Sequence, residues 1–300
     1  MRQVLFVVLV CAPALALADN APKSDTTMLA DAPWLVTHLN AQAIDQSGNE
    51  REAQTLVLLD VRADKKQRTV KPPGAITIDA AEWKKAFKDG TDAEEWTERI
   101  GGVLKNKDAT VVVLDEKFTP TAARIWWILK YWGVNDVRVL DGGFADYKQA
   151  GGIIVAGERG PSDHASDFTA KPHPERLVTF DQMQEIIGNG GESCLVDTRS
   201  EGENTAGYIP SATLLDWQEL VDPETGKLRS KDELKKLLAR VEFDPTTRTV
   251  TYCRSGGRAS VMAFAMELVS GKPVANYYGS WSDWTRRGGE QAVDEVSVGR

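Results

Sequence analysis

The chain repeats itself at a spacing of 137 positions, and this repeat constrains its fold more than any other feature. The segment Leu58–Arg62 (LLDVR) returns as Leu195–Arg199 (LVDTR), and Gly142–Tyr147 (GGFADY) returns as Gly279–Trp284 (GSWSDW). Self-similarity at a fixed offset indicates a duplicated structural unit. Two copies fit into 300 residues as domains of ordinary size. We therefore expect two domains with the same fold.

Within each copy, short apolar segments alternate with longer helical ones. The expected elements include strands at Thr55–Leu59 and Thr110–Leu114 and helices at Thr121–Tyr131 and Lys231–Val241. This alternation indicates an α/β fold in which each domain is a parallel sheet with helices on both faces. We place the domains at 19–157 and 176–300, joined by a polar, proline-bearing linker at 158–175.

The first residues have the pattern of a secretory signal. Arg2 precedes an apolar stretch that starts at Val4, and Ala16–Ala18 (ALA) is a small-x-small cleavage site. A single-pass anchor is disfavoured because the uninterrupted apolar stretch is shorter than the roughly 18 residues that span a bilayer. We predict a signal peptide at 1–18 and a periplasmic or secreted mature protein that is not held at the membrane.

The amino-acid composition limits which ligands and partners we expect for this protein. The net charge of −8 argues against nucleic acid. With three histidines and no Cys-x-x-Cys, we expect neither a metal nor a cofactor, and we expect a monomer. Removal of the signal leaves Cys194 and Cys253 as the only thiols, and an oxidising compartment would allow them to pair. An inert, buried role is favoured for Cys194 over that of a resolving thiol, since it begins an apolar strand.

Cys253 lies in the stretch TVTYCRSGGRAS. Thr249–Tyr252 favours a strand and Val261–Leu268 a buried helix, so the cysteine occupies a strand-to-helix turn. Backbone N–H groups in such a turn point into one concavity, and the helix N-terminus adds positive potential. Arg254 and Arg258 add charge that favours a thiolate near neutral pH. We interpret the loop as an anion cradle around a reactive sulfur, rather than as the setting of a small buried hydrophobe.

Comparison of the two copies separates scaffold from function. The Asp-x-Arg element occurs in both, at Asp60–Arg62 and at Asp197–Arg199, which favours a structural carboxylate–guanidinium pair. Cys253 occurs in one copy only. Its counterpart is Asp115 or Glu116, depending on where a one-residue gap is placed, and is a carboxylate in either case. Only the second copy is equipped for thiol chemistry.

These residues resemble the two-domain rhodaneses, the sulfurtransferases of the thiosulfate and 3-mercaptopyruvate type. The likeness covers nearly all of the mature chain and rests on the Asp-x-Arg elements, the Gly-Gly-Phe and Gly-Ser-Trp segments, Gly207–Ala212 (GYIPSA) and above all Cys253–Arg258 (CRSGGR). The resemblance implies two tandem rhodanese-like domains, of which the first is catalytically inactive. It also implies that Cys253 takes a sulfane sulfur from a small anionic donor and passes it to cyanide or a thiol.

The resemblance also implies roles for the rest of the loop. The arginines would bind the donor and the backbone N–H groups would hold the persulfide, which gives the substrate-binding set Arg254, Ser255, Gly256, Gly257 and Arg258. Trp34 matches a family position that faces the site, although core packing is an equal alternative.

Two departures concern the donor. Glu203 stands where thiosulfate-using relatives often carry an arginine, and Arg254 and Arg258 replace the glycine and threonine typical of mercaptopyruvate enzymes. We favour thiosulfate or another small anionic sulfane donor.

Three other functions use a cysteine in a comparable setting. Phosphatases and arsenate reductases use Cys-x5-Arg, whereas Ala259 stands six places after Cys253. The cradle is therefore expected to be too small for phosphate. A Cys–His hydrolase lacks a suitably placed histidine. A periplasmic persulfide carrier or sensor without turnover stays open.

Overall fold

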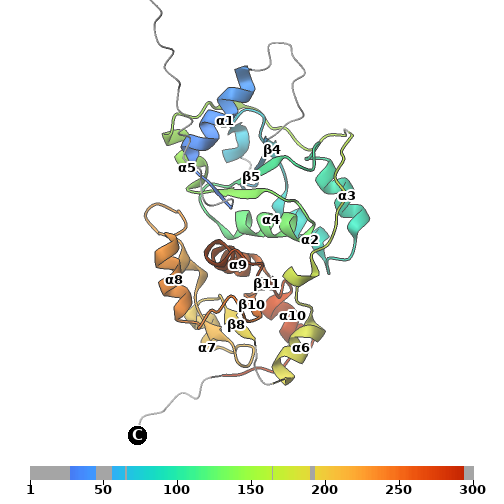
Figure 1. Cartoon of the computed structure of the whole chain (residues 1–300), viewed down its shortest axis with the longest axis vertical. Helices are drawn as coiled ribbons and strands as arrows, with labels where there is room; N and C mark the ends of the chain where they lie inside the picture. The colour runs from blue at the N-terminus through green and yellow to red at the C-terminus, as the bar shows by residue number, and fades with distance from the viewer. Residues whose placement is uncertain (1–27, 45–55, 65, 164, 190–192, 294–300) are drawn as a thin grey trace, which may run out of the picture.

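The computed structural model describes residues 28–44, 56–64, 66–163, 165–189 and 193–293. Two separate parallel sheets are flanked by helices, one in each repeat (Figure 1). The first has the strand order β1-β6-β5-β2-β4 and the second β11-β10-β8-β9, and every neighbouring pair is parallel. The predicted α/β fold with two tandem domains is confirmed.

The first domain contains β1–β7 and α1–α5. Its strands are β1 (Leu29–Ala30), β2 (Leu56–Asp60), β3 (Val70–Lys71), β4 (Ile76–Thr77), β5 (Thr110–Leu114), β6 (Val137–Leu140) and β7 (Val155–Ala156). Its helices are α1 (Ala32–Ile44), α2 (Ala80–Phe87), α3 (Ala93–Gly101), α4 (Pro120–Tyr131) and α5 (Gly143–Gln149). Strands β3 and β7 form a separate antiparallel ribbon.

The second domain contains β8–β11 and α6–α10. Its strands are β8 (Cys194–Asp197), β9 (Thr213–Leu214), β10 (Thr249–Tyr252) and β11 (Ala275–Asn276). Its helices are α6 (Phe180–Gly188), α7 (Glu201–Thr205), α8 (Lys231–Ala239), α9 (Gly257–Ser270) and α10 (Ser280–Arg286). Short 3-10 helices are η1 (Gln67–Thr69), η2 (Pro174–Arg176) and η3 (Trp217–Leu220).

The predicted elements agree closely with the observed ones, and the exceptions have local causes. Strands β5 and β10 have the predicted bounds. Helix α4 starts one residue early, at Pro120, because the Thr119 side chain caps it and proline suits the first turn. Helix α9 starts at Gly257 rather than Val261, because Gly256 (φ 89°) turns the chain into the helix directly behind the loop.

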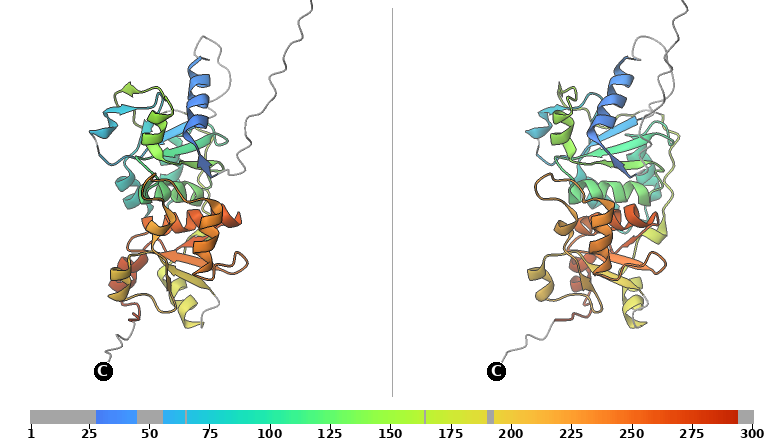
Figure 2. Two further views of the ribbon diagram at one scale, coloured as in Figure 1. Left: turned by 90° about the vertical axis from the view of Figure 1, so that its left-hand side faces the viewer. Right: turned by 60° about the vertical axis from the view of Figure 1, so that its left-hand side comes forward.

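The two domains pack through α4 and α9, which lie between the two sheets in every view (Figures 1 and 2). The ring of Trp126 meets that of Phe264 at 4.7 Å, and Trp127 stacks on Tyr278 at 5.1 Å. One cluster of buried apolar side chains runs across both domains. This packing brings the start of α9, and with it the Cys253 loop, against the first domain.

The Asp-x-Arg elements are structural, as predicted. Arg62 contacts Asp60 at 2.9 and 2.7 Å, and Arg199 contacts Asp197 at 3.0 and 2.6 Å, with all four side chains buried. Asp197 also accepts a hydrogen bond from the Tyr252 hydroxyl at 2.9 Å. The carboxylate oxygens of Asp197 are thus engaged by neighbouring residues of the scaffold.

No disulfide can join Cys194 and Cys253, the two thiols that remain after removal of the predicted signal peptide. Cys194 pairs with Thr249 at the start of β10, whereas Cys253 follows the end of that strand. About 13 Å of strand therefore separates them, well beyond the Cα separation of a disulfide. Both cysteines are free. Cys194 Sγ donates to the Val241 carbonyl at 3.3 Å, and burial raises the pKa of this thiol, which fits the inert role predicted for it.

The predicted signal peptide, 1–18, lies outside the described residues. Within the described part of the chain, no helix has the length and apolar character needed to cross a bilayer. The domain boundaries at 157 and 176 stay predictions.

Candidate active site

Cys253 sits between β10 and α9 with its side chain almost fully buried. Its Sγ accepts a hydrogen bond from the backbone N–H of Gly256 at 3.1 Å. The N–H groups of Ser255 and Gly257 lie in the same turn, and neither donates to the sulfur within the described structure. The loop thus aims one of the three predicted donors at the thiol.

The position of Gly256 requires glycine. Its φ of 89° lies in the left-handed region, and a Cβ there would lie 2.8 Å from the Tyr278 carbonyl oxygen. The Gly256 carbonyl accepts hydrogen bonds from Asn276 Nδ2 and from the N–H of Ser260, both at 3.0 Å. The Gly256 N–H that faces the sulfur is therefore fixed in place, by the close approach of Tyr278 and by the hydrogen bonds to the Gly256 carbonyl.

Ser280 supports the cysteine from the opposite side, and sequence reasoning missed it. Its buried Oγ accepts the Cys253 N–H at 3.1 Å, donates to the Tyr277 carbonyl at 2.8 Å and lies 3.9 Å from Sγ. Ser280 has φ 55°, and its counterpart in the first domain is Gly143 with φ 63°. A serine where the other copy has glycine is the signal that would have revealed it.

Arg258, predicted to bind the donor, already has an acidic partner. Its Nη1 contacts Glu203 Oε2 at 2.5 Å and its Nη2 contacts Oε1 at 2.9 Å. This hydrogen-bonded pairing lowers the pKa of Glu203 to about 2 and raises that of Arg258. Ser200 caps α7 and fixes Glu203 in its first turn. Any anionic donor therefore has to compete with a carboxylate for Arg258.

Arg254 differs from Arg258 in both exposure and pairing. Its side chain is exposed, and it forms no ion pair with any residue in the described ranges. It is the loop cation that is open to an incoming anion.

The first domain adds two cations to the loop, which sequence reasoning also missed. Arg124 Nη2 donates to the Ser255 carbonyl at 2.9 Å, and Lys84 Nζ lies 3.3 Å from Ser255 Oγ. Burial and the nearby Arg124 charge lower the pKa of Lys84. The second copy has Val221 and Val261 at the matching positions, so the copy comparison that singled out Cys253 would also single out these residues.

The first-domain counterpart of Cys253 is Asp115. The Trp281 N–H donates to the Cys253 carbonyl at 2.9 Å, and Phe144, 137 positions earlier, donates in the same way to the Asp115 carbonyl at 2.8 Å. The Asp115 carboxylate accepts from the Glu116 N–H and from the Thr119 hydroxyl, and its burial raises its pKa. This loop is built around a carboxylate that one backbone N–H and one hydroxyl of the same loop hold in place.

The interpretation of Trp34 as facing the site is wrong. Its ring packs against His38 at 4.1 Å and under Arg138 at 4.9 Å, beside the apolar cluster of α1 and α5. Helix α1 lies on the face of the first sheet away from α9 (Figure 1). Trp34 therefore has the core role that was the alternative.

The fold and the site together define a duplicated α/β protein with a single cysteine-centred loop at the carboxyl edge of its second sheet. The rhodanese-like domain model matches residues 41–150 and 179–287, and so covers both repeats. The chain belongs to the rhodanese family of sulfurtransferases.

Relatives and solved structures agree with this assignment. The chain is 32% identical to a thiosulfate sulfurtransferase of Corynebacterium glutamicum, over 75% of this chain and 82% of that one. It is 30% identical to a sulfur carrier protein of Thermus thermophilus, over 71% and 81%. The fold resembles that of an anaerobic ergothioneine biosynthesis enzyme from Chlorobium limicola, with a TM-score of 0.72 at 20% identity, over 89% of this chain and 70% of that one.

Proposed function

We propose that this protein is a sulfurtransferase that carries a sulfane sulfur on Cys253, from thiosulfate or a similar small anionic donor to cyanide or a thiol. The observation that carries the proposal is the Cys253 sulfur held at 3.1 Å by the Gly256 N–H in a turn flanked by arginines. The thiolate is the nucleophilic form of a cysteine.

The proposed reaction has two displacements. The thiolate attacks the outer sulfur of thiosulfate, a new S–S bond forms on Cys253, and sulfite leaves with the electron pair of the broken bond. Cyanide then attacks the terminal sulfur of the persulfide, and thiocyanate leaves as the Cys253 thiolate returns. Arg254 is the open cation for the arriving donor, and the N–H groups of Ser255, Gly256 and Gly257 would hold the terminal sulfur.

The names of the relatives support two versions of this function. The Corynebacterium protein is named for turnover of thiosulfate, and the Thermus protein for carrying sulfur. Carrier and transferase share the persulfide and differ only in whether a small acceptor discharges it. The predicted signal peptide would place either activity in the periplasm or outside the cell.

Thiocyanate formation from thiosulfate and cyanide tests the proposal. Wild type should turn over repeatedly, Cys253→Ser should be inactive, and the matched variant Cys194→Ser should keep wild-type rates because its thiol lies at the other end of β8 and β10. One thiocyanate per chain, without turnover, would favour the carrier. Hydrolysis of p-nitrophenyl phosphate in place of sulfur transfer would contradict both versions.

A further inference from the structure

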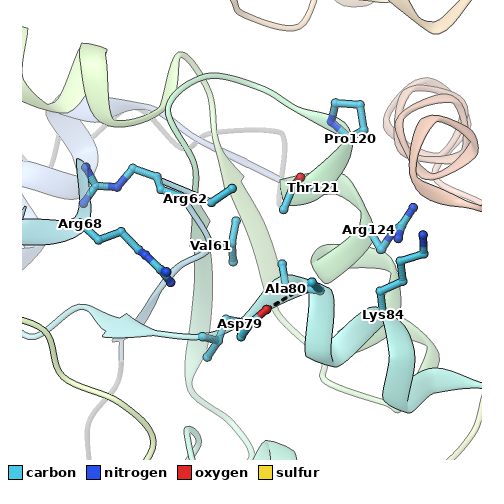
Figure 3. A pocket seen from close by; sticks show the side chains of 12 residues that line it. Val61, Arg62, Arg68, Asp79, Ala80, Lys84, Pro120, Thr121 and Arg124 are labelled. Carbon is cyan, nitrogen blue, oxygen red and sulfur yellow. Dashed lines mark hydrogen bonds between the residues drawn. The ribbon is translucent and has the colours of Figure 1, made fainter. Parts of the chain in front are cut away.

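A cationic cavity lies in the first domain at the place that corresponds to the active site of the second. Its volume is about 410 Å³, and its polar lining comprises Arg62, Arg68, Asp79, Lys84, Thr121 and Arg124 (Figure 3). Displacement by 137 positions carries Arg62 onto Arg199, Asp79 onto Asp216 and Thr121 onto Arg258. The cavity is thus the first domain's version of the catalytic pocket, with Thr121 in place of the paired arginine.

Positive charge dominates this cavity. Arg68, Lys84 and Arg124 contribute three cations, and Asp79 is the acidic residue in the lining. The Asp79 carboxylate is engaged as the cap of α2, where it accepts the N–H groups of Ala81 at 2.9 Å and Glu82 at 3.1 Å. Its single charge can balance at most one of the three cations.

The fourth lining cation, Arg62, is already balanced. It is held by Asp60 at 2.7 Å and contacts Glu116 at 3.3 Å. The excess charge therefore comes from the other three cations.

Arg68 is the buried member of these three cations. Its side chain is 9% exposed, its Nε has no hydrogen-bond partner among the residues that the structure describes, and the Glu158 carboxylate lies 4.0 Å away from that atom. Figure 3 shows its guanidinium group directed toward Asp79, with Lys84 and Arg124 at the other end of the cavity. A buried cation with an unmet donor is costly unless an acceptor occupies the space in front of it.

We propose that this cavity binds a small oxyanion, with the sulfur oxyanions sulfate, sulfite and thiosulfate as the class that fits. The lining of this one cavity sets three cations against one engaged carboxylate, and such an excess of positive charge suits a divalent anion with several acceptor oxygens. The site goes beyond sulfur transfer by Cys253 and exists whether or not that reaction occurs. Because Lys84 and Arg124 also contact Ser255, an anion held here draws on the same cations as the active-site loop.

The test is isothermal titration of sulfate into the full-length Cys253→Ser protein, which cannot form a persulfide. The key variant is Thr121→Asp, and Thr121→Asn is its uncharged match. An acidic residue is favourable in the first turn of α4, so Thr121→Asp should fold. Its carboxylate should weaken sulfate binding at least about tenfold, because like charges at close range repel strongly.

Thr121→Asn should bind sulfate almost as well as the parent, and Arg68→Gln should bind it more weakly. Repeating the titration with sulfite and thiosulfate ranks the members of the class. Sulfate binding that is equal in the Asp and Asn variants would place the anion elsewhere, such as the Cys253 loop, and overturn the proposal. Absence of binding to the parent protein at millimolar sulfate would overturn it as well. Neither result depends on sulfurtransferase activity, which the thiocyanate assay measures separately.

Discussion

Glu203 and Arg258 form a two-pronged ion pair at the active-site loop, with contacts of 2.5 and 2.9 Å. The pair joins α7 to the first turn of α9, and both side chains are partly exposed. An anionic donor that reaches Cys253 therefore meets an arginine whose charge is already balanced. This arrangement makes Glu203 the residue that limits how well the loop accepts an anion.

Removal of the Glu203 charge should improve the use of thiosulfate. Glu203→Gln keeps a side-chain oxygen that can accept the Ser200 N–H in the capping box of α7, and it frees Arg258 for the donor. We therefore expect kcat/KM for thiosulfate to rise about tenfold, the equivalent of one charge-assisted contact. Glu201→Gln removes an exposed charge from the same helix and is the control. An unchanged kcat/KM in Glu203→Gln would mean that the donor binds away from Arg258.

The same pair should make stability depend on pH. The pKa of Glu203 in the folded protein is about 2, below the ordinary value of 4.5, so the pair stabilises the fold above about pH 4.5 and loses this effect as the pH falls toward 2. The free energies of unfolding of wild type and Glu203→Gln, from urea titrations, should differ most at pH 6, differ less at pH 3 and converge as the pH approaches 2. The difference should be at most about 1 kcal/mol because the pair is partly exposed. A gap that widens on acidification would contradict this assignment.

Ser280 supports Cys253 with its hydroxyl, and we expect its backbone conformation to be strained. A non-glycine residue at φ 55° costs about 1 to 2 kcal/mol, and both Ser280→Gly and Ser280→Ala remove the hydroxyl that accepts the Cys253 N–H. Ser280→Gly should therefore be more stable than Ser280→Ala by about 1 kcal/mol in thermal or urea unfolding. Equal stabilities would show that the backbone there relaxes without glycine.

A buried ion pair holds the 3-10 helix η2 (Pro174–Arg176) onto α9. Arg176 Nη1 lies 2.6 Å from Glu267 Oε1, which also accepts the Val274 N–H at 3.0 Å. Arg176→Met leaves Glu267 buried without its partner and should lower the free energy of unfolding by about 3 to 5 kcal/mol. Arg176→Met combined with Glu267→Gln should recover part of this loss, and a double variant as unstable as the single one would contradict the pairing.

The sequence predicted the parts of this protein that depend on local pattern and on the repeat. Strand β10, the turn at Cys253 and the buried Asp-x-Arg pairs follow from residues that are close together in the chain. The partner of Arg258 could not be predicted, because Glu203 is 55 positions away and reaches it only through the packing of α7 beside α9.

Contacts between the two domains could not be predicted from the sequence either. Lys84 and Arg124 approach Ser255 because α4 packs on α9, and nothing in the repeat indicates which faces of the two domains meet. The choice between the cleft and the core for Trp34 was left open for the same reason. Its family position indicated the cleft, whereas α1 packs beside α5 on the other face of the first sheet.

In the proposed reaction Cys253 alone carries the transferred sulfur, and mass spectrometry of the intact mature protein tests this most directly. Thiosulfate treatment should add about 32 Da to wild type and to Cys194→Ser, the mass of one sulfur atom on one thiol, and cyanide should remove it. Cys253→Ser should gain nothing. A gain of this mass by Cys253→Ser, or none by wild type, would contradict the account.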